Sequence, residues 1–208
     1  MKQKLAFTVV LSVIAASLVS CAVYTAPTRE ETLQVVKSSF KERGIAKLDR
    51  LNQSELQVAC SEASLTGKDL PKDVRDRLEK QALATVKFPA DGQYLGDFKQ
   101  GERIAQTGVG MQWSDSDTTV AGGNCYACHE IAPQEIAFGN IGPSLKGYRK
   151  LRGSSPAVMT YTWGKLWNSH AYNACSQMPR YGDANILTTA QLKDLMALLL
   201  DPNSPVNK

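Results

Sequence analysis

The sequence predicts an all-α protein. Apolar residues recur at helical spacing along most of the chain, capping patterns open several of these stretches, and no convincing alternating strand pattern is found. Of the 208 residues, 43% are hydrophobic and 21% are charged, which is the usual balance of a folded globular chain. The order of the helices can therefore be followed from one start or stop signal to the next.

The first twenty residues have the composition of an export signal. A basic start, Met1–Lys4, is followed by the uncharged apolar run Leu5–Ser20. This run is shorter than the roughly 20 apolar residues of a membrane-spanning helix, which favours a signal peptide over residues 1–20. Cys21 follows a small residue, as in the lipobox of bacterial lipoproteins, and would become a lipidated N-terminus; cleavage after a small residue such as Ala22 is the alternative. The expected location is the periplasm, with attachment to the membrane through Cys21.

Residues 21–90 are expected to form a helical N-terminal extension. Thr28 and Glu31 have the spacing of a capping box, which predicts a helix over Arg29–Arg43 that stops at Gly44.

Two further helices follow in this extension. The capping-type pair Asn52 and Glu55 opens the first, a short helix that is expected to reach about Glu62, and Ser64–Asp69 is expected to be a loop. Pro71 suits the first turn of the next helix, which is expected to run to about Lys87. The Pro- and Gly-containing stretch 88–92 then marks the boundary to a second domain over residues 91–208.

The second domain is expected to hold three main helices, connected by Gly-rich loops. The helices are expected over Asp97–Thr107, Pro156–Trp167 and Ala190–Leu200, the last starting from Thr188 or Thr189. Loops are expected over Gly110–Gly123, 133–155 (with room for a short helix) and Asn173–Asn185, and the end, Asp201–Lys208, is expected to be a tail.

The motif C-Y-A-C-H at residues 125–129 carries the strongest chemical signal. Thiols at this spacing lie under the two vinyl groups of a haem, and the histidine that follows can fold back to bind its iron. A zinc site would need a second ligand pair, which the sequence lacks, and a thioredoxin-like redox pair would need a preceding strand. The motif therefore predicts one haem c, bound covalently to Cys125 and Cys128 and ligated by His129.

The second axial ligand of the iron would come from further along the chain. Met178 lies in the irregular stretch QMPRYG, and such a loop can bring a thioether to the haem face opposite His129. Met159 and Met196 lie on expected helices, where a core role is the simpler interpretation. His170 is a further candidate, although a lone histidine is more often hydrogen-bonded or exposed. Met178 is the predicted ligand.

Two cysteines remain once Cys21 and the haem thiols are assigned. Cys60 and Cys175 would form a disulfide in an oxidising compartment, and two separate buried thiols are the alternative. The formal net charge is +4, but no block of five or more Lys and Arg residues occurs, so nucleic acid is not an expected partner.

The part of the chain from about 96 to 200 resembles the class I cytochrome c family. The order of motifs is the same: C-x-x-C-H, then G-P, then M-P, then a terminal helix. The resemblance implies a class I cytochrome c domain in which the helices at Asp97–Thr107 and Ala190–Leu200 pack against each other. It also implies that the Pro143 carbonyl accepts a hydrogen bond from His129 and orients the ring.

Five stretches taken together are similar to the SoxX subunit of the SoxAX complex of sulfur-oxidising bacteria. They are residues 122–129 (GGNCYACH), 139–145 (GNIGPSL), 161–163 (YTW), 174–182 (ACSQMPRYG) and 198–207 (LLLDPNSPVN). The last two are the most specific, and the lipobox is a departure from the usual soluble form of that family.

This resemblance implies an electron-transfer subunit of an enzyme, with no catalytic residue of its own. SoxAX is an L-cysteine S-thiosulfotransferase: it conjugates thiosulfate oxidatively to a cysteine of the SoxYZ carrier, which releases two electrons. A SoxA-type cytochrome would form a heterodimer with this chain and hold the active haem. The haem of this chain would pass electrons to a downstream acceptor cytochrome. A free-standing, lipid-anchored periplasmic electron carrier is the alternative.

Overall fold

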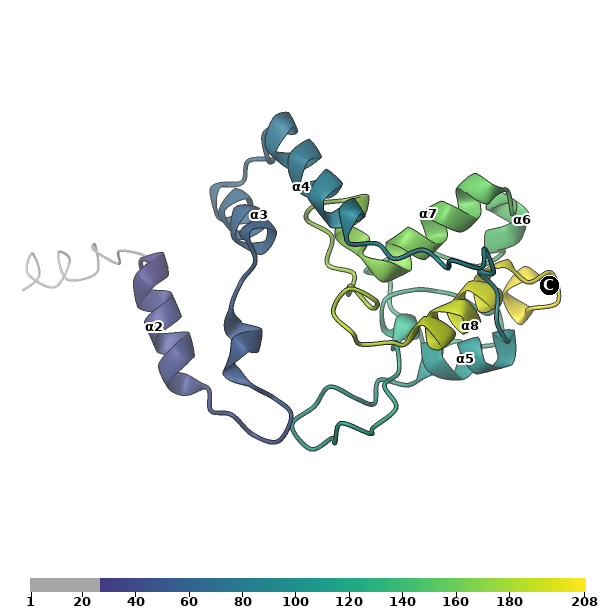
Figure 1. The fold of residues 1–208 in the computed structure, drawn as a ribbon, viewed down its shortest axis with the longest axis horizontal. Helices are drawn as coiled ribbons and strands as arrows, with labels where there is room; N and C mark the ends of the chain where they lie inside the picture. Colours follow the sequence, from purple (N-terminus) through teal and green to yellow (C-terminus); the bar gives the residue numbers. More distant parts are fainter. Residues whose placement is uncertain (1–26) are drawn as a thin grey trace, which may run out of the picture. The chain divides into compact units, whose positions relative to one another are not determined.

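The computed structural model describes residues 27–208, so the expected signal peptide and Cys21 lie outside the described residues. Within 27–208 the regular elements are helices, and an isolated bridge between Arg43 and Ala46 is the sole pairing of extended backbone (Figure 1). The all-α prediction is confirmed. No helix of this part of the chain is long and apolar enough to cross a membrane.

Helix α2 (Arg29–Ser39) belongs to a unit of its own, separate from the unit formed by Glu42–Lys208. The predicted capping box is present: the Thr28 hydroxyl accepts from the Glu31 amide at 3.2 Å, and the Glu31 carboxylate accepts from the Thr28 amide at 2.7 Å. The helix ends at Ser39 and not at Arg43 as predicted. None of the residues of α2 is buried.

Helix α3 (Glu55–Thr66) is longer than predicted. Its N-cap is Ser54, not Asn52, and it continues through Glu62 into the stretch expected to be a loop. The helix ends where Gly67 adopts the left-handed conformation, with φ of 64°, and its amide donates to the carbonyls of the last turn. The preceding 3-10 helix η1 (Leu48–Leu51) was not predicted.

Helix α4 (Lys72–Ala84) follows Pro71 as predicted but stops before Lys87. Two side chains donate to one carbonyl of its last turn: the Thr85 hydroxyl donates to Ala82 O at 2.9 Å, and Asn168 Nδ2 donates to the same oxygen at 3.4 Å. Both α3 and α4 lie in the same compact unit as the later helices. The predicted domain boundary at 88–92 stays a prediction.

Helices α5 (Phe98–Gln106) and α8 (Thr189–Leu200) pack against each other, as predicted (Figure 1). They meet at Gly101, where a Cβ atom would lie 2.2 Å from the Asp194 carbonyl oxygen. Backbone contact this close requires a glycine, which fixes where the two helices cross.

The remaining helices surround this pair, and one large core lies between them. They are η2 (Cys125–Ala127), α6 (Tyr148–Arg152), α7 (Pro156–Trp167), η3 (Ser169–Ala171) and η4 (Pro205–Asn207). The bounds of α7 are those predicted. The core contains Trp163, Met196 and Val206, each with 0% of its surface exposed.

The C-terminal residues 201–208 are folded onto the domain, although a tail was predicted. The Ser204 hydroxyl donates to Leu198 O at 2.5 Å, and Asn207 Nδ2 donates to Leu199 O at 3.0 Å. These bonds satisfy carbonyls at the end of α8 that the helix itself leaves without partners.

Candidate functional site

Cys125, Cys128 and His129 lie on one tight turn. The amides of Cys128 and His129 both donate to Cys125 O, at 3.1 and 2.9 Å, and both cysteines are free thiols. Asn124, with φ of 48°, turns the chain into the 3-10 helix η2. The Tyr126 hydroxyl donates to Glu102 of α5 at 2.8 Å, which fixes the turn to the core helix. The thiols of Cys125 and Cys128 and the imidazole of His129 therefore belong to one hydrogen-bonded turn that is attached to α5.

The imidazole of His129 is oriented by a backbone carbonyl. His129 Nδ1 lies 2.7 Å from Pro143 O. A carbonyl oxygen only accepts hydrogen bonds, so Nδ1 carries the proton and Nε2 has a free lone pair. This is the tautomer that a metal ligand requires. A second bond, from the Gly142 amide to Cys128 O at 2.8 Å, holds the segment around Gly142 and Pro143 to the Cys125–His129 turn.

Gly142 lies directly against the His129 ring. A Cβ atom at Gly142 would be 2.2 Å from His129 Cε1 and 2.5 Å from Nδ1. Gly139, in the same segment, lies equally close to the backbone of the turn, since its Cβ would be 1.9 Å from Ala127 O. The segment therefore reaches the turn only because it has no side chains there.

Replacing Gly142 with alanine should displace the His129 ring. We expect the free energy of unfolding to fall by about 1–3 kcal/mol, because the new methyl group overpacks the contact. The Nδ1 proton of His129 should also exchange faster with solvent, which NMR of the imidazole can measure. Ile141→Ala is the matched control, because Ile141 is 78% exposed and its truncation leaves the contact intact. An unchanged Nδ1 proton in Gly142→Ala would contradict the orienting role of this segment.

Met178 lies on the irregular segment between η3 and α8. Its amide donates to the Ser176 hydroxyl at 3.2 Å, and its carbonyl accepts from the Ser169 hydroxyl at 2.6 Å. The half-buried side chain packs against the edge of the main core. Hydrogen bonds on both sides of Met178 therefore fix its backbone.

The other candidate ligands have different surroundings. Met196 is fully buried in α8, and Met159 is half-buried in α7. His170 Nε2 lies 3.2 Å from Ser176 O, and burial together with the Arg180 charge lowers the pKa of His170. Both effects favour the uncharged form of His170, and its ring is hydrogen-bonded to the segment that carries Met178.

Tyr181 joins the Met178 segment to the start of the C-x-x-C-H turn. Its hydroxyl donates to Gly123 O at 2.5 Å, and burial raises the pKa of this hydroxyl. Burial also raises the pKa of the neighbouring Cys125 thiol to about 12, so the sulfur is protonated at neutral pH. The contact brings two distant segments of the sequence to one place.

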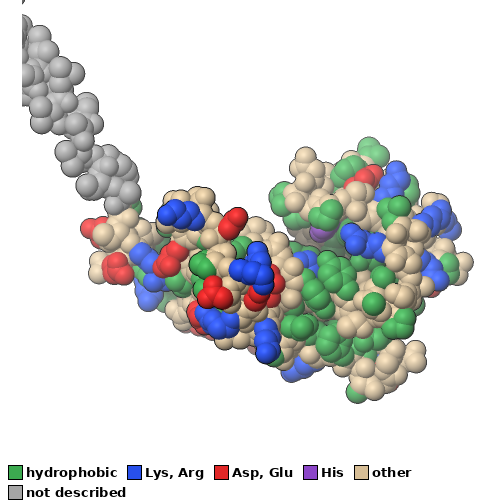
Figure 2. All heavy atoms as spheres, turned by 90° about the horizontal axis from the view of Figure 1, so that it is seen from above, with side chains coloured by type: hydrophobic (Ala, Val, Ile, Leu, Met, Phe, Trp, Pro, Cys, Tyr) green, Lys and Arg blue, Asp and Glu red, His purple; other side chains and the backbone are tan. Residues whose placement is uncertain are grey.

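Two observations show that the region around the turn fits a haem. The indole Nε1 of Trp167 is buried without a hydrogen-bond partner, and Gly182 packs on the same ring, with its Cβ position 2.4 Å from Cδ2. A buried donor of this kind requires an acceptor, which a haem propionate would provide. Apolar side chains that flank the turn are also exposed: Ile136 by 89%, Ile141 by 78% and Phe138 by 44%. Figure 2 shows a histidine side chain in a hollow bordered by hydrophobic side chains.

Within residues 27–208, no three His, Cys, Asp or Glu side chains are grouped to hold a metal ion.

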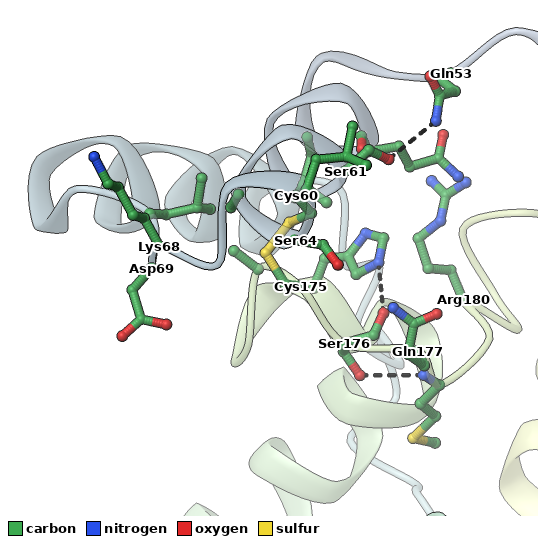
Figure 3. Close-up of a pocket in the computed structure, with 18 of the residues that line it drawn as sticks. Gln53, Cys60, Ser61, Ser64, Lys68, Asp69, Cys175, Ser176, Gln177 and Arg180 are labelled. Carbon is green, nitrogen blue, oxygen red and sulfur yellow. Dashed lines mark hydrogen bonds between the residues drawn. A yellow bond between two sulfur atoms is a disulfide. The ribbon is translucent and has the colours of Figure 1, made fainter. Parts of the chain in front are cut away.

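The predicted disulfide between Cys60 and Cys175 is present, and it joins α3 to the segment that carries Met178. Beside it lies a cavity of about 940 Å³ between α3 and residues 170–180 (Figure 3). The polar lining includes Gln57, Ser64 and Arg180.

Local sequence patterns do not predict the role of Ser169, which is fully buried and holds Met178 O. Ser169 lies just after the end of α7, in the polar stretch 168–170. A buried serine has no sequence signal of its own, because its role depends on a partner that only the fold supplies.

No protein-family model matches the chain. A protein of Aquifex aeolicus (strain VF5), described as an uncharacterized lipoprotein, is 32% identical in an alignment of 220 residues that covers the whole of both chains. This chain belongs to the same family as that lipoprotein.

Proposed function

We propose that this chain is a single-haem c-type cytochrome that carries electrons. The observation that carries the proposal is the pairing of His129 Nδ1 with Pro143 O, on a turn that also presents two free thiols. This arrangement leaves Nε2 free as a ligand, and C-x-x-C is the sequence spacing of the thiols that attach a haem covalently. The unpartnered indole of Trp167 and the exposed apolar rim of the turn support it.

Four residues of the chain would hold the haem. Cys125 and Cys128 would form the two thioether bonds, and His129 and Met178 would be the axial ligands. Bound haem would supply a one-electron couple, and methionine ligation would raise its potential relative to two nitrogen ligands. Filling both axial positions favours electron transfer over the binding of small ligands. No catalytic residue is proposed in this chain.

Replacing Met178 with alanine should remove the second axial ligand. In the purified ferric protein, we expect loss of the weak red-end absorption band that a thioether–iron bond gives, together with a lower midpoint potential. Met159→Ala is the control that should keep the band, because Met159 is a second half-buried methionine. Met178→His should lower the potential while keeping both axial positions filled. A full band in Met178→Ala would show that another residue is the ligand.

We further propose that the chain is the electron-transfer subunit of a SoxAX-type complex. The support is the similarity of five sequence stretches to the SoxX subunit. They include residues 174–182, which surround Met178, and residues 198–207 near the end of the chain. In such a complex a SoxA-type cytochrome would be the partner, the SoxYZ carrier would receive thiosulfate, and an acceptor cytochrome would take the electrons. A free-standing, lipid-anchored electron carrier is the second candidate, favoured by the lipoprotein relative.

Purification of the tagged chain from thiosulfate-grown native cells distinguishes the two candidates. The subunit proposal expects a second haem protein in equal amount on a haem-stained gel, and conjugation of thiosulfate to SoxYZ by the purified pair. Recovery of this chain alone, with a complete spectrum, would instead favour the free-standing carrier. A gel without haem at the position of this chain would contradict both.

We also propose that the chain is exported and held at the periplasmic side of a membrane through lipid on Cys21. The basic start, the apolar run and the small residue before Cys21 support this, as does the lipoprotein relative. One acyl chain gives only marginal binding, so the several chains of a bacterial lipoprotein would be needed for stable attachment.

A further inference from the structure

We propose that α3, α4 and the Cys60–Cys175 disulfide form a clamp that positions Met178 as an iron ligand. This inference rests on the proposed function, because it concerns the second axial ligand of a bound haem. Cys60, Cys175, Ala174 and Glu79 are positioning residues: none of them would touch the haem, and they would act through the backbone that carries Met178.

The two halves of the segment between η3 and α8 are held in different ways. The second half is fixed by main-chain bonds: the amides of Gly182 and Asp183 donate to Trp167 O at 3.1 and 3.0 Å, and those of Ile186 and Leu187 donate to Tyr181 O. The first half, residues 173–179, has one internal main-chain bond, from the Ser176 amide to Asn173 O at 3.0 Å. Met178 lies in this first half, so its position depends on contacts from elsewhere. Side-chain bonds from Ser169 to Met178 O and from His170 to Ser176 O provide two of them, and the remaining contacts come from the clamp.

The clamp supplies those contacts at two adjacent residues. Ala174 is 1% exposed and packs in a small second core with Leu56 of α3 and Leu78 of α4. Its amide also donates to the Glu79 carboxylate of α4 at 3.1 Å. The next residue, Cys175, is bonded covalently to Cys60 of α3. The chain is therefore fixed just three positions before Met178.

Helix α4 is in turn firmly attached to the main core. Asn168 Nδ2 donates to the Thr85 hydroxyl at 2.9 Å, and the Trp163 indole donates to Lys87 O at 2.9 Å. Ala82 and Val86 pack in the main core itself. The clamp thus transmits the rigidity of the core, through α4 and α3, to the segment before Met178.

The cavity explains why a covalent bond matters here. The cavity separates part of α3 from residues 176–180, so that side of the segment has open space where packing would otherwise support it (Figure 3). Packing holds a segment only where atoms are in contact. The disulfide crosses at the edge of this space and replaces the missing support. Without it, residues 175–178 would be held mainly by the side-chain bonds from Ser169 and His170, and movement into the cavity would carry Met178 out of position.

The test compares wild-type holoprotein with the double variant Cys60→Ser/Cys175→Ser. We expect the variant to keep covalent haem on a denaturing gel but to lose the red-end thioether–iron band. Its apparent affinity for added imidazole should rise about tenfold, because a larger fraction of molecules would have an open axial position. Limited proteolysis should cut faster within 173–180. Arg77→Ala is the control, because it removes exposed side-chain contacts to Glu55 of α3 and Gln81 of α4 and leaves the disulfide and Ala174 unchanged.

The outcomes separate the clamp from the proposed function. A wild-type band and imidazole affinity in the double variant would overturn the clamp and leave the cytochrome intact. Wild-type protein with haem but no thioether band would also overturn it, and wild-type protein without haem would overturn the proposed function and the clamp together. If the double variant does not accumulate, the disulfide of wild-type holoprotein is reduced and both thiols are capped with a maleimide. The haem iron is then reoxidised, and the thioether–iron band and the imidazole affinity are measured as before.

Discussion

Replacing both Cys125 and Cys128 with serine should abolish covalent haem, from one haem per chain to none. A thioether bond requires a thiol to add to each vinyl group, and serine has no such chemistry. The two sulfurs are free and are held on the same turn as His129, and the other two cysteines within residues 27–208 are bonded to each other. The measurement is haem staining after denaturing electrophoresis of protein expressed with its own signal sequence, in a host that attaches haem to c-type cytochromes.

The single variants and the disulfide variant make this experiment specific. Cys125→Ser and Cys128→Ser each leave one thiol, and each should retain haem through a single thioether at reduced yield. Cys60→Ser/Cys175→Ser should keep full staining, because those sulfurs are bonded to each other in a different part of the structure. Staining that persists when Cys125 and Cys128 are both replaced would place the attachment elsewhere and contradict the proposed site.

Local sequence signals predicted the later helices well. Helix α7 has the predicted bounds because Ser155 caps it and Pro156 occupies its first position, and both signals are local. Helix α8 begins after Thr188 for the same reason, through a capping box with Gln191.

The extension was harder to predict, because its ends depend on contacts from distant residues. Helix α2 stops at Ser39, and none of its residues is buried. Helix α4 stops at Ala84, where the side chains of Asn168 and Thr85 both donate to the Ala82 carbonyl. A partner that is more than eighty positions away leaves no mark on the local pattern.

In the candidate site, too, the local features were predictable from the sequence and those that depend on distant residues were not. The turn at Cys125–His129 is local, and its motif was read from five consecutive residues. The bond from His129 to Pro143 was expected only through the resemblance to class I cytochromes c. The disulfide followed from counting cysteines, but its role beside Met178 could not, because that role depends on the second core around Ala174 and on the neighbouring cavity.

Replacing Gly101 with alanine should destabilise the protein, although the helix propensity of alanine predicts the opposite. In an isolated helix the change would stabilise by about 1 kcal/mol. Here the new Cβ would lie 2.2 Å from the Asp194 carbonyl oxygen and 2.7 Å from its carbon, and both are backbone atoms of α8. Helix backbone cannot move aside locally, so α5 and α8 would have to separate, at a cost of about 3 kcal/mol or more for overpacking. We expect a net loss of about 2 kcal/mol, or a fall in Tm of roughly 6 °C.

Gly164→Ala is the matched control for this prediction. It also adds a methyl group inside a helix, and its Cβ would lie 2.6 Å from the Tyr172 hydroxyl oxygen. That neighbour is the end of a half-buried side chain, which can rotate away, so the loss of stability should be smaller. Thermal unfolding of the two holoproteins gives the comparison. If Gly101→Ala raised Tm, helix propensity would outweigh the contact, and the crossing of α5 and α8 would not depend on the absence of a side chain at residue 101.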